Sequence, residues 1–245
     1  MRKIHFQGPR NVRDLGGIRS ADGRQIRRGQ IVRGDGLARM TDADLRKFSE
    51  LGIATVIDLR TADECKRAPS KLPRDSNIKI VNHGFMIKGS FEMFDAVNNE
   101  GADAAAAHRM MSSNYAAMPM EHSQVVRDVF STLVSEPHHP CYIHCTSGKD
   151  RTGLICALLL LALDVAEEDV IEDYVLSNVE HQPVDVFRDS ARKDAVGKIM
   201  SAHEDFIRAA LDSVRDSCGS VENYFEHHIG LDLAWRTTLA ELMLE

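Results

Sequence analysis

The ten residues HCTSGKDRTG, at positions 144–153, hold the side chains of this chain best suited to chemistry. A short apolar run precedes them and an unbroken apolar stretch follows, so we predict a strand that ends at His144 and a helix that begins near Arg151. The loop between the two lies where backbone N–H groups and a helix dipole converge on an anion. This arrangement predicts a phosphate-binding loop.

The residue types in the loop add a nucleophile to the phosphate cradle. Gly148 lets the backbone turn without a Cβ, successive N–H groups form the concave surface, and Arg151 offers a planar fork to two phosphate oxygens. Cys145 lies at the base, where the same positive potential stabilises a thiolate. A thiolate below a bound phosphoryl group is aligned for in-line attack, which forms a cysteinyl phosphate that water hydrolyses.

Two other kinds of cysteine site fit the spacing poorly. A zinc site would have to draw its ligands from His138, His139, Cys141, His144 and Cys145. In a strand Cys141 and Cys145 face one side and His144 faces the other, so these side chains do not converge on one ion. A redox pair of Cys141 and Cys145 would span about 13 Å along a strand, whereas a disulfide needs a Cα separation of roughly 4.4 to 6.8 Å. We therefore expect no metal site here and no disulfide.

Two further interpretations, a nucleotide-binding loop and a purely structural cysteine, account for fewer of these residues than a phosphate-binding loop with a nucleophilic cysteine does. The G-x-x-x-x-G-K-S/T motif is absent, because Asp150 follows Gly148 and Lys149, and Ile143 stands in place of the first glycine. A buried structural cysteine beside a helix cap would leave Gly148, Lys149 and Arg151 without a role.

The rest of the chain alternates predicted strands and helices. This alternation predicts an α/β fold whose largely parallel sheet is flanked by helices, followed by a helical C-terminal part. The strands are expected at 30–33, 54–60, 77–81 and 141–144, the helices at 41–52, at 121–135 and from Arg151 onward, with breaks at Asp164, Pro183, Gly219 and Gly230.

Residues 83–120 form a long insertion rich in Met, Ala and Phe between a predicted strand and a predicted helix. Insertions of this length in compact domains are usually functional, and Met side chains repack easily. We expect a helical lid over the phosphate loop; an ordinary pair of core helices is the alternative.

Length and composition favour one soluble domain that spans residues 1–245. The chain has 43% hydrophobic residues, enough for a large core, and its N-terminus lacks the apolar stretch of a secretory signal. Its longest apolar run, 154–163, has about half the length that a bilayer requires. Five cysteines without framework spacing fit reduced thiols. We expect a cytoplasmic protein, although a secretion route without such a signal leaves no trace in a sequence.

The net charge of −7 argues against a nucleic-acid-binding protein or one attracted to anionic membranes in general. Its distribution is uneven, because residues 1–46 contain 11 Lys and Arg against 5 Asp and Glu. This basic segment has two open interpretations: it lines the site of an anionic substrate, or it is a solvated arm balanced by acidic helices.

The loop resembles the H-C-x5-R-S/T signature of cysteine-based protein phosphatases. Its G-K-D-R-T-G ending is similar to that of the bacterial tyrosine phosphatase family which includes a secreted phosphotyrosine and phosphoinositide phosphatase of mycobacteria. Further matches to this family cover most of the chain: NVRDLGG at 11–17, IVRGDGL at 31–37, VIDLRTADE at 56–64 and DYVLSN at 173–178. The resemblance implies a cysteine-phosphatase fold with a helical lid, which supports the lid interpretation of 83–120.

By position, the resemblance makes Cys145 the nucleophile and Arg151 the phosphate clamp. It implies that Thr152 hydrogen-bonds the cysteine sulfur and that His144 braces the loop. Helix capping is the plain structural role of Thr152, and the two roles are compatible. Arg60 and Glu64 are expected to form a structural ion pair. The substrate-binding residues would then be Thr146, Ser147, Gly148, Lys149 and Thr152.

The general acid remains open between two carboxyl groups. Animal tyrosine phosphatases take this acid from a mobile Trp-Pro-Asp loop, whereas the single tryptophan here, Trp235, has no Pro-Asp beside it. Asp150 within the loop resembles the arrangement of myotubularin-type lipid phosphatases, and Asp58 at the end of a predicted strand is the second candidate.

We therefore expect a phosphatase that needs no metal or other cofactor and hydrolyses phosphotyrosine, with phosphoserine and phosphothreonine (dual specificity) or phosphoinositides as further possible substrates. Lys149 adds a positive charge suited to a multiply phosphorylated headgroup, and membrane contact would follow only from a lipid substrate. The alternative function is a phosphate-binding module that does not hydrolyse its ligand.

Overall fold

The computed structural model describes residues 2–74, 76–135, 140–180 and 186–245. Within these residues, one five-stranded sheet has the order β1-β2-β5-β3-β4. Strands β2 to β5 run parallel, and β1 is antiparallel to β2. The strands span Arg13–Asp14 (β1), Ile31–Gly34 (β2), Thr55–Asp58 (β3), Lys79–Asn82 (β4) and Cys141–His144 (β5). The predicted α/β class with a largely parallel sheet is confirmed.

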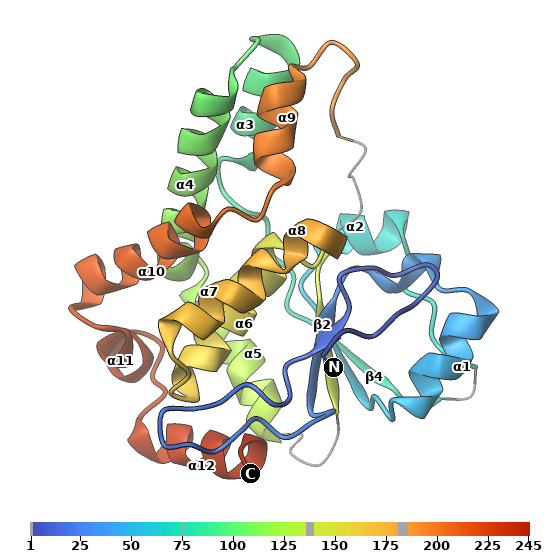
Figure 1. Ribbon diagram of the computed structural model, residues 1–245, viewed down its shortest axis with the longest axis vertical. Helices are drawn as coiled ribbons and strands as arrows, with labels where there is room; N and C mark the ends of the chain where they lie inside the picture. Colours follow the sequence, from blue (N-terminus) through green and yellow to red (C-terminus); the bar gives the residue numbers. More distant parts are fainter. Residues whose placement is uncertain (1, 75, 136–139, 181–185) are drawn as a thin grey trace.

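The three central strands are buried on both faces, as a parallel sheet covered by helices requires. Alternate side chains face opposite ways along each strand. Val56 and Tyr142 pack in a small core with Phe48 of helix α1 (Asp42–Glu50), while Ile57 and Ile143 join the main core on the other face. Figure 1 shows α1 on one side of the sheet and α5, α6 and α7 on the other.

The predicted capping residue sets the start of α1. The side chain of Thr41 accepts from the backbone N–H of Asp44, and the carboxylate of Asp44 accepts from the N–H of Thr41, which completes a capping box before α1.

The other helices are α2 (Ala62–Arg67), α3 (Ser90–Asn99), α4 (Ala104–Glu121), α5 (Ser123–Ser135), α6 (Asp150–Ala162), α7 (Glu167–Val175), α8 (Ser177–Glu180), α9 (Lys193–Met200), α10 (Glu204–Cys218), α11 (Val221–Asn223) and α12 (Leu233–Met243), with a 3-10 turn η1 (Leu37–Arg39) and a π-helical turn η2 (Tyr224–His228).

The helical breaks agree with the predicted positions where the structure describes them. Asp164 follows α6 with a φ of 59°, Gly219 follows α10 with a φ of 81°, and Gly230 has a φ of 71°. Pro183 lies outside the described residues, as do His138 and His139. No helix among the described residues is long and apolar enough to cross a membrane.

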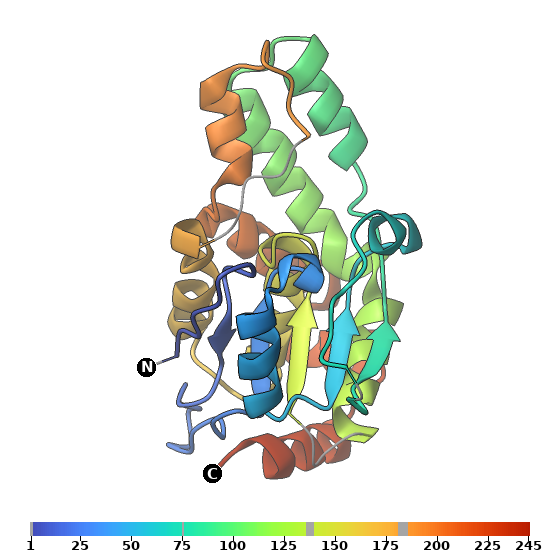
Figure 2. The ribbon, with the colours of Figure 1, turned by 90° about the vertical axis from the view of Figure 1, so that its right-hand side faces the viewer.

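A helical projection rises from the end of the sheet where the parallel strands finish. It contains α3, the first part of α4, and α9, as Figure 1 shows, and in Figure 2 strands β5, β3 and β4 point toward it. Helix α4 packs against α9 and also against α10, which anchors the projection to the body. Residues 83–120 thus form a pair of helices at the place where a lid was predicted. The segment with α9 completes the projection.

Candidate active site

The phosphate-loop residues lie directly beyond β5, in the middle of the sheet. The register aligns Gly34, His144 and Asp58 at the ends of three neighbouring strands, so Cys145 is the first residue past the central strand end. Helix α6 begins at Asp150, and no side chain caps it at Lys149. The first-turn N–H groups of α6 are therefore available to an anion.

Neighbouring segments hold the carbonyl groups of this loop from behind. Gly148 has a φ of 68°, and a Cβ at this position would lie 2.3 Å from the carbonyl oxygen of Gly34, so the turn requires glycine. Arg33 donates to the carbonyl of Gly148 at 2.9 Å, and the side-chain amide of Asn11 donates to the carbonyl of Ser147 at 3.2 Å.

The basic N-terminal segment supports the loop from a buried ionic cluster. Asp173 of α7 accepts hydrogen bonds from Arg2, Arg13 and Arg33. Burial opposes the ionised carboxyl group, but the three arginines outweigh it and lower the pKa of Asp173. No described residue of 1–46 lines the cavity above the loop, so the interpretation as a substrate-lining segment is wrong. Most of the basic side chains of this segment are exposed, as the solvated-arm interpretation predicts, but Arg13 and Arg33 are buried.

A cavity of about 270 Å³ opens above the loop. Cys145 lies at its floor with only 2% of its surface exposed. Loop residues Thr146, Ser147, Lys149, Asp150 and Arg151 share the floor; the walls come from Met86, Ile87, Phe91, Met93, Phe94, Met111 and Asn114 of the predicted lid and from Val186, Ile199 and Met200 of the later segment. Of the predicted substrate-binding residues, Gly148 and Thr152 do not reach this surface.

Glu64 of α2 holds the guanidinium group of Arg151. The two side chains form a bidentate ion pair with N to O distances of 2.7 and 2.6 Å, and the carbonyls of Leu59 and Phe85 accept further bonds from Arg151. Burial opposes the charged forms, but this pairing raises the pKa of Arg151 and lowers the pKa of Glu64 to about 2. The predicted Arg60–Glu64 ion pair is wrong, since Glu64 binds the loop arginine instead.

Arg60 pairs with Asp58, the second candidate for the general acid. Arg60 donates to both carboxylate oxygens of Asp58, with the shortest distance 2.7 Å. Burial disfavours the ionised carboxyl group, but Arg60 outweighs it and lowers the pKa of Asp58. Asp58 is 2% exposed and does not line the cavity, so it is both ionised and out of reach of a substrate bound there.

His144 and Thr152 are both completely buried beside Cys145. Nδ1 of His144 lies 2.9 Å from the carbonyl oxygen of Cys145, which braces the loop as predicted, and burial lowers the pKa of His144, so the imidazole is neutral. Oγ1 of Thr152 is buried without a hydrogen-bond partner in the part of the chain that the structure describes. The predicted hydrogen bond from Thr152 to the cysteine sulfur is therefore not formed here, nor does its hydroxyl cap α6.

Asp150, in contrast, lines the cavity and accepts a hydrogen bond from a residue of the predicted lid. The hydroxyl of Tyr115 on α4 donates to Oδ1 of Asp150 at 2.7 Å, and the hydroxyl of Tyr174 donates to that of Tyr115 at 2.7 Å. Sequence reasoning missed Tyr115, although a lone tyrosine in a Met- and Ala-rich insertion was a signal for a specific polar contact.

Lys149 lines the cavity, but its ammonium group binds main-chain carbonyls. Its ammonium group donates to the carbonyls of Ile199 at 2.5 Å and Ser201 at 3.2 Å, and lies 3.2 Å from Oδ1 of Asp150. The side chain is 4% exposed. The positive charge that was predicted to bind a substrate headgroup thus binds main-chain carbonyls at the C-terminal end of α9.

The fold and this site define a cysteine-based phosphatase. The sequence profile of the tyrosine phosphatase family matches residues 4–245, and the chain belongs to this family of phosphoric monoester hydrolases. Its substrates are therefore phosphorylated molecules.

Several known proteins resemble the chain. A Cupriavidus necator protein, whose name places it among candidate tyrosine-protein phosphatases, is 27% identical over 241 residues, which cover 94% of this chain and 85% of the relative. The triple specificity protein phosphatase PtpB of Mycobacterium tuberculosis is 27% identical over 192 residues, 70% of this chain and 67% of its own. Among solved structures, the core catalytic domain of the PP-IP phosphatase SIW14 from S. cerevisiae covers 85% of this chain and 94% of its own at 13% identity and a TM-score of 0.39, a likeness too distant to carry an argument.

Proposed function

We propose that this phosphatase hydrolyses phosphotyrosine through a cysteinyl-phosphate intermediate. The single observation that supports the proposal most is the cavity, which has Cys145 at its floor and Asp150 and Arg151 beside it. Arg151 and the loop N–H groups bind the phosphoryl oxygens, Cys145 attacks phosphorus, and Asp150 protonates the leaving oxygen. The buried hydroxyl of Thr152 is available to donate to the thiolate.

The cavity walls favour an aromatic phosphate over a multiply phosphorylated headgroup. They consist largely of Met and Phe side chains, and Phe91 and Met86 at the cavity are 70% and 39% exposed. Three of the described residues that line the cavity are basic. Arg151 is proposed to bind the reacting phosphoryl group, Lys149 binds main-chain carbonyls, and Arg67 donates through Nε to the carbonyl of Asp63. An apolar chamber with few uncommitted charges binds a phenyl ring well and inositol phosphates poorly.

Dual specificity and a cytoplasmic location extend this proposal. The relative named a triple specificity protein phosphatase supports a test of phosphoserine and phosphothreonine peptides and of phosphoinositides beside phosphotyrosine peptides. The cytoplasmic location stays a prediction from the sequence, as do the absence of nucleic-acid binding and the restriction of membrane contact to a lipid substrate.

The test is release of p-nitrophenol from its phosphate ester in the presence of EDTA. We expect full activity with the chelator, inhibition by vanadate and by thiol alkylation, and no turnover by Cys145→Ser, which should still bind phosphate. Loss of activity on chelation would contradict the cysteine mechanism. Stoichiometric binding of phosphopeptides by the wild-type protein without turnover would instead support a non-hydrolysing binding module.

A further inference from the structure

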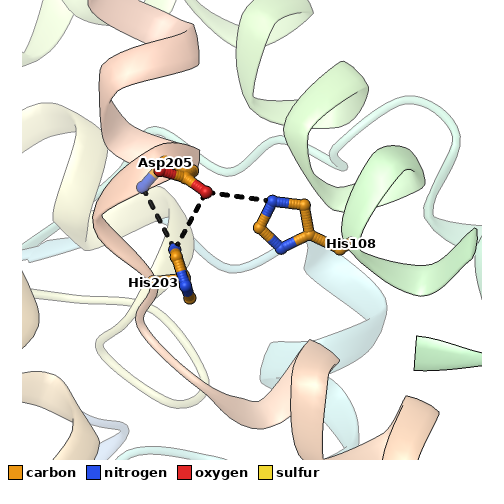
Figure 3. A group of neighbouring side chains, drawn as sticks. All are labelled: His108, His203 and Asp205. Carbon is orange, nitrogen blue, oxygen red and sulfur yellow. Dashed lines mark hydrogen bonds and ion pairs between the residues drawn. The ribbon is translucent and has the colours of Figure 1, made fainter. Parts of the chain in front are cut away.

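Three metal-binding side chains meet where the lid joins the body. His108 lies on α4, and His203 and Asp205 lie at the start of α10, as Figure 3 shows. Their ligand atoms all lie within 4.8 Å of one another. Nε2 of His108 is 3.1 Å from Oδ2 of Asp205, and Nδ1 of His203 is 3.3 Å from the same oxygen. One carboxylate oxygen thus lies between two imidazoles that come from different helices.

We propose that His108, His203 and Asp205 bind one transition-metal ion of the zinc class. Zinc takes imidazole nitrogen and carboxylate oxygen at about 2.0 to 2.2 Å, so neighbouring ligands of a tetrahedral ion lie about 3.3 to 3.5 Å apart. The separations of 3.1 and 3.3 Å match two of these edges, and the third edge, between the two imidazole nitrogens, lies within 4.8 Å. The side chains are 27%, 37% and 52% exposed for His108, His203 and Asp205, which leaves the fourth position open to water.

The hydrogen-bond pattern at His203 gives an independent reason for a cation. Its Nδ1 accepts from the backbone N–H of Asp205 at 3.3 Å and caps α10 through this bond. In this hydrogen bond Nδ1 is the acceptor, and the Asp205 carboxylate oxygen, which is also an acceptor, lies 3.3 Å from the same nitrogen. A bound cation converts this unfavourable contact into two coordinate bonds, at the loss of one long capping bond.

An aromatic ring supports both imidazoles and connects them to the candidate active site. The ring of Phe206 lies 5.1 Å from that of His108 and 5.7 Å from that of His203, measured between centroids. The same ring lies 5.6 Å from Tyr115, which donates to Asp150. His108 and Tyr115 are seven residues apart on α4, so they lie two turns apart on one face of the helix.

A metal ion at this position would join the two segments that touch the rim of the phosphate loop. Helix α4 carries Tyr115, and the chain just before His203 carries the two carbonyls that accept from Lys149. The ion would therefore fix the lid against the body without touching the reacting atoms. The proposed reaction uses no metal at the reacting atoms, and the binding test below does not measure turnover, so the two proposals are tested separately.

The test is a titration with Co²⁺, followed by its visible d–d absorption, on full-length Cys145→Ser protein, in which the active-site thiol cannot bind metal. We expect a saturable signal at one equivalent with no thiolate charge-transfer band, and displacement of cobalt by Zn²⁺. His108→Gln suits a helix and His203→Asn can still cap α10, so both variants should fold, and each should weaken binding by about tenfold or more.

His227→Gln, which removes an exposed histidine of η2, is the matched control and should bind cobalt like its parent. If either histidine variant loses the circular dichroism spectrum of the folded protein, Asp205→Asn is titrated in its place. The proposal is overturned by the absence of a saturable signal, by a thiolate charge-transfer band, or by an equal loss of binding in the His227 control.

Discussion

The hydroxyl of Tyr115 on lid helix α4 donates a hydrogen bond to Oδ1 of Asp150 in the phosphate loop, over 2.7 Å. Burial raises the pKa of Tyr115 well above its ordinary value, so the phenol stays neutral and remains a donor. Because Oδ1 is engaged by Tyr115 and approached by Lys149, Oδ2 is the oxygen from which Asp150, as the proposed general acid, would transfer its proton. We propose that the predicted lid orients Asp150 through Tyr115, as a positioning residue.

Tyr115→Phe keeps the ring that packs on Phe206 and removes only the hydroxyl group. One lost hydrogen bond should slow esters of high-pKa alcohols roughly fivefold to tenfold, and activated aryl phosphates much less. The measurement is kcat across a leaving-group series. Tyr174→Phe, one bond further from Asp150, is the matched control and should show a smaller effect of the same kind. An equal slowing of all esters by Tyr115→Phe would assign the hydroxyl a structural role only.

Asp150→Asn and Asp58→Asn should differ in kind. Asp150→Asn should slow esters with poor leaving groups by about a hundredfold or more and steepen the dependence of rate on leaving-group pKa. Asp58→Asn leaves buried Arg60 without the carboxylate that balances its charge, so it should lower the free energy of unfolding by about 3 kcal/mol or more and leave that dependence unchanged. If the Asp58 variant alone steepens the dependence, Asp58 is the acid.

Lys149→Ala tests whether this charge selects substrates or holds the lid. Because the ammonium group binds the carbonyls of Ile199 and Ser201, its loss should lower kcat/KM by a similar factor on phosphotyrosine peptides, phosphoserine peptides and phosphoinositides. Arg67→Ala removes a different positive charge from the same cavity and serves as the control. A selective loss of phosphoinositide turnover in the Lys149 variant would restore the predicted role in headgroup binding.

The lid should exchange amide hydrogens faster without ligand than with it. Residues 83–120 and the segment with α9 enclose the cavity with Met and Phe side chains, which repack easily. Vanadate at the loop should slow exchange in both segments and leave the buried strand β3 unchanged as an internal reference. Equal, strong protection with and without vanadate would make residues 83–120 ordinary core.

The loop and its strand were predictable because their signals are local. The apolar run of β5, the glycine that the turn requires and the apolar helix after it lie within about twenty consecutive residues, and the predicted bounds of β5 match those observed. Capping residues likewise fixed the start of α1. In contrast, β1 has only two residues, too few for a period-two pattern, so it was not predicted.

The partners of the site residues were harder to predict, because they depend on contacts between distant segments. Glu64 is 87 residues from Arg151, and Tyr115 is 35 residues from Asp150. The motif around Arg60 suggested a pair with Glu64, but Arg60 pairs with Asp58 two residues before it, and Glu64 binds the distant loop arginine instead. The ionic cluster on Asp173 joins segments more than 100 residues apart, and charge counts along the sequence do not reveal such a pairing.

Asp35, in the loop after β2, gives a prediction for the pH dependence of stability. It is 5% exposed, and its carboxylate accepts from the backbone N–H of Arg10 at 2.7 Å. Burial outweighs this bond and raises the pKa of Asp35 to about 8. The folded protein therefore holds a proton that the unfolded chain, with an ordinary carboxyl pKa of about 3.9, has released.

Between these two pKa values the folded state binds more protons than the unfolded state, so the free energy of unfolding falls as pH rises, by up to about 1.4 kcal/mol per pH unit from this group. Asp35→Asn resembles the protonated carboxyl group and still accepts from Arg10, so it should be more stable than the wild type near pH 8, by an amount that shrinks toward about pH 5. Urea unfolding of both proteins at several pH values gives the difference, in which the contributions of all other titrating groups cancel. If Asp35→Asn is instead the less stable protein near pH 8, the carboxylate is ionised in the fold and its hydrogen bond with Arg10 outweighs the cost of burying its charge.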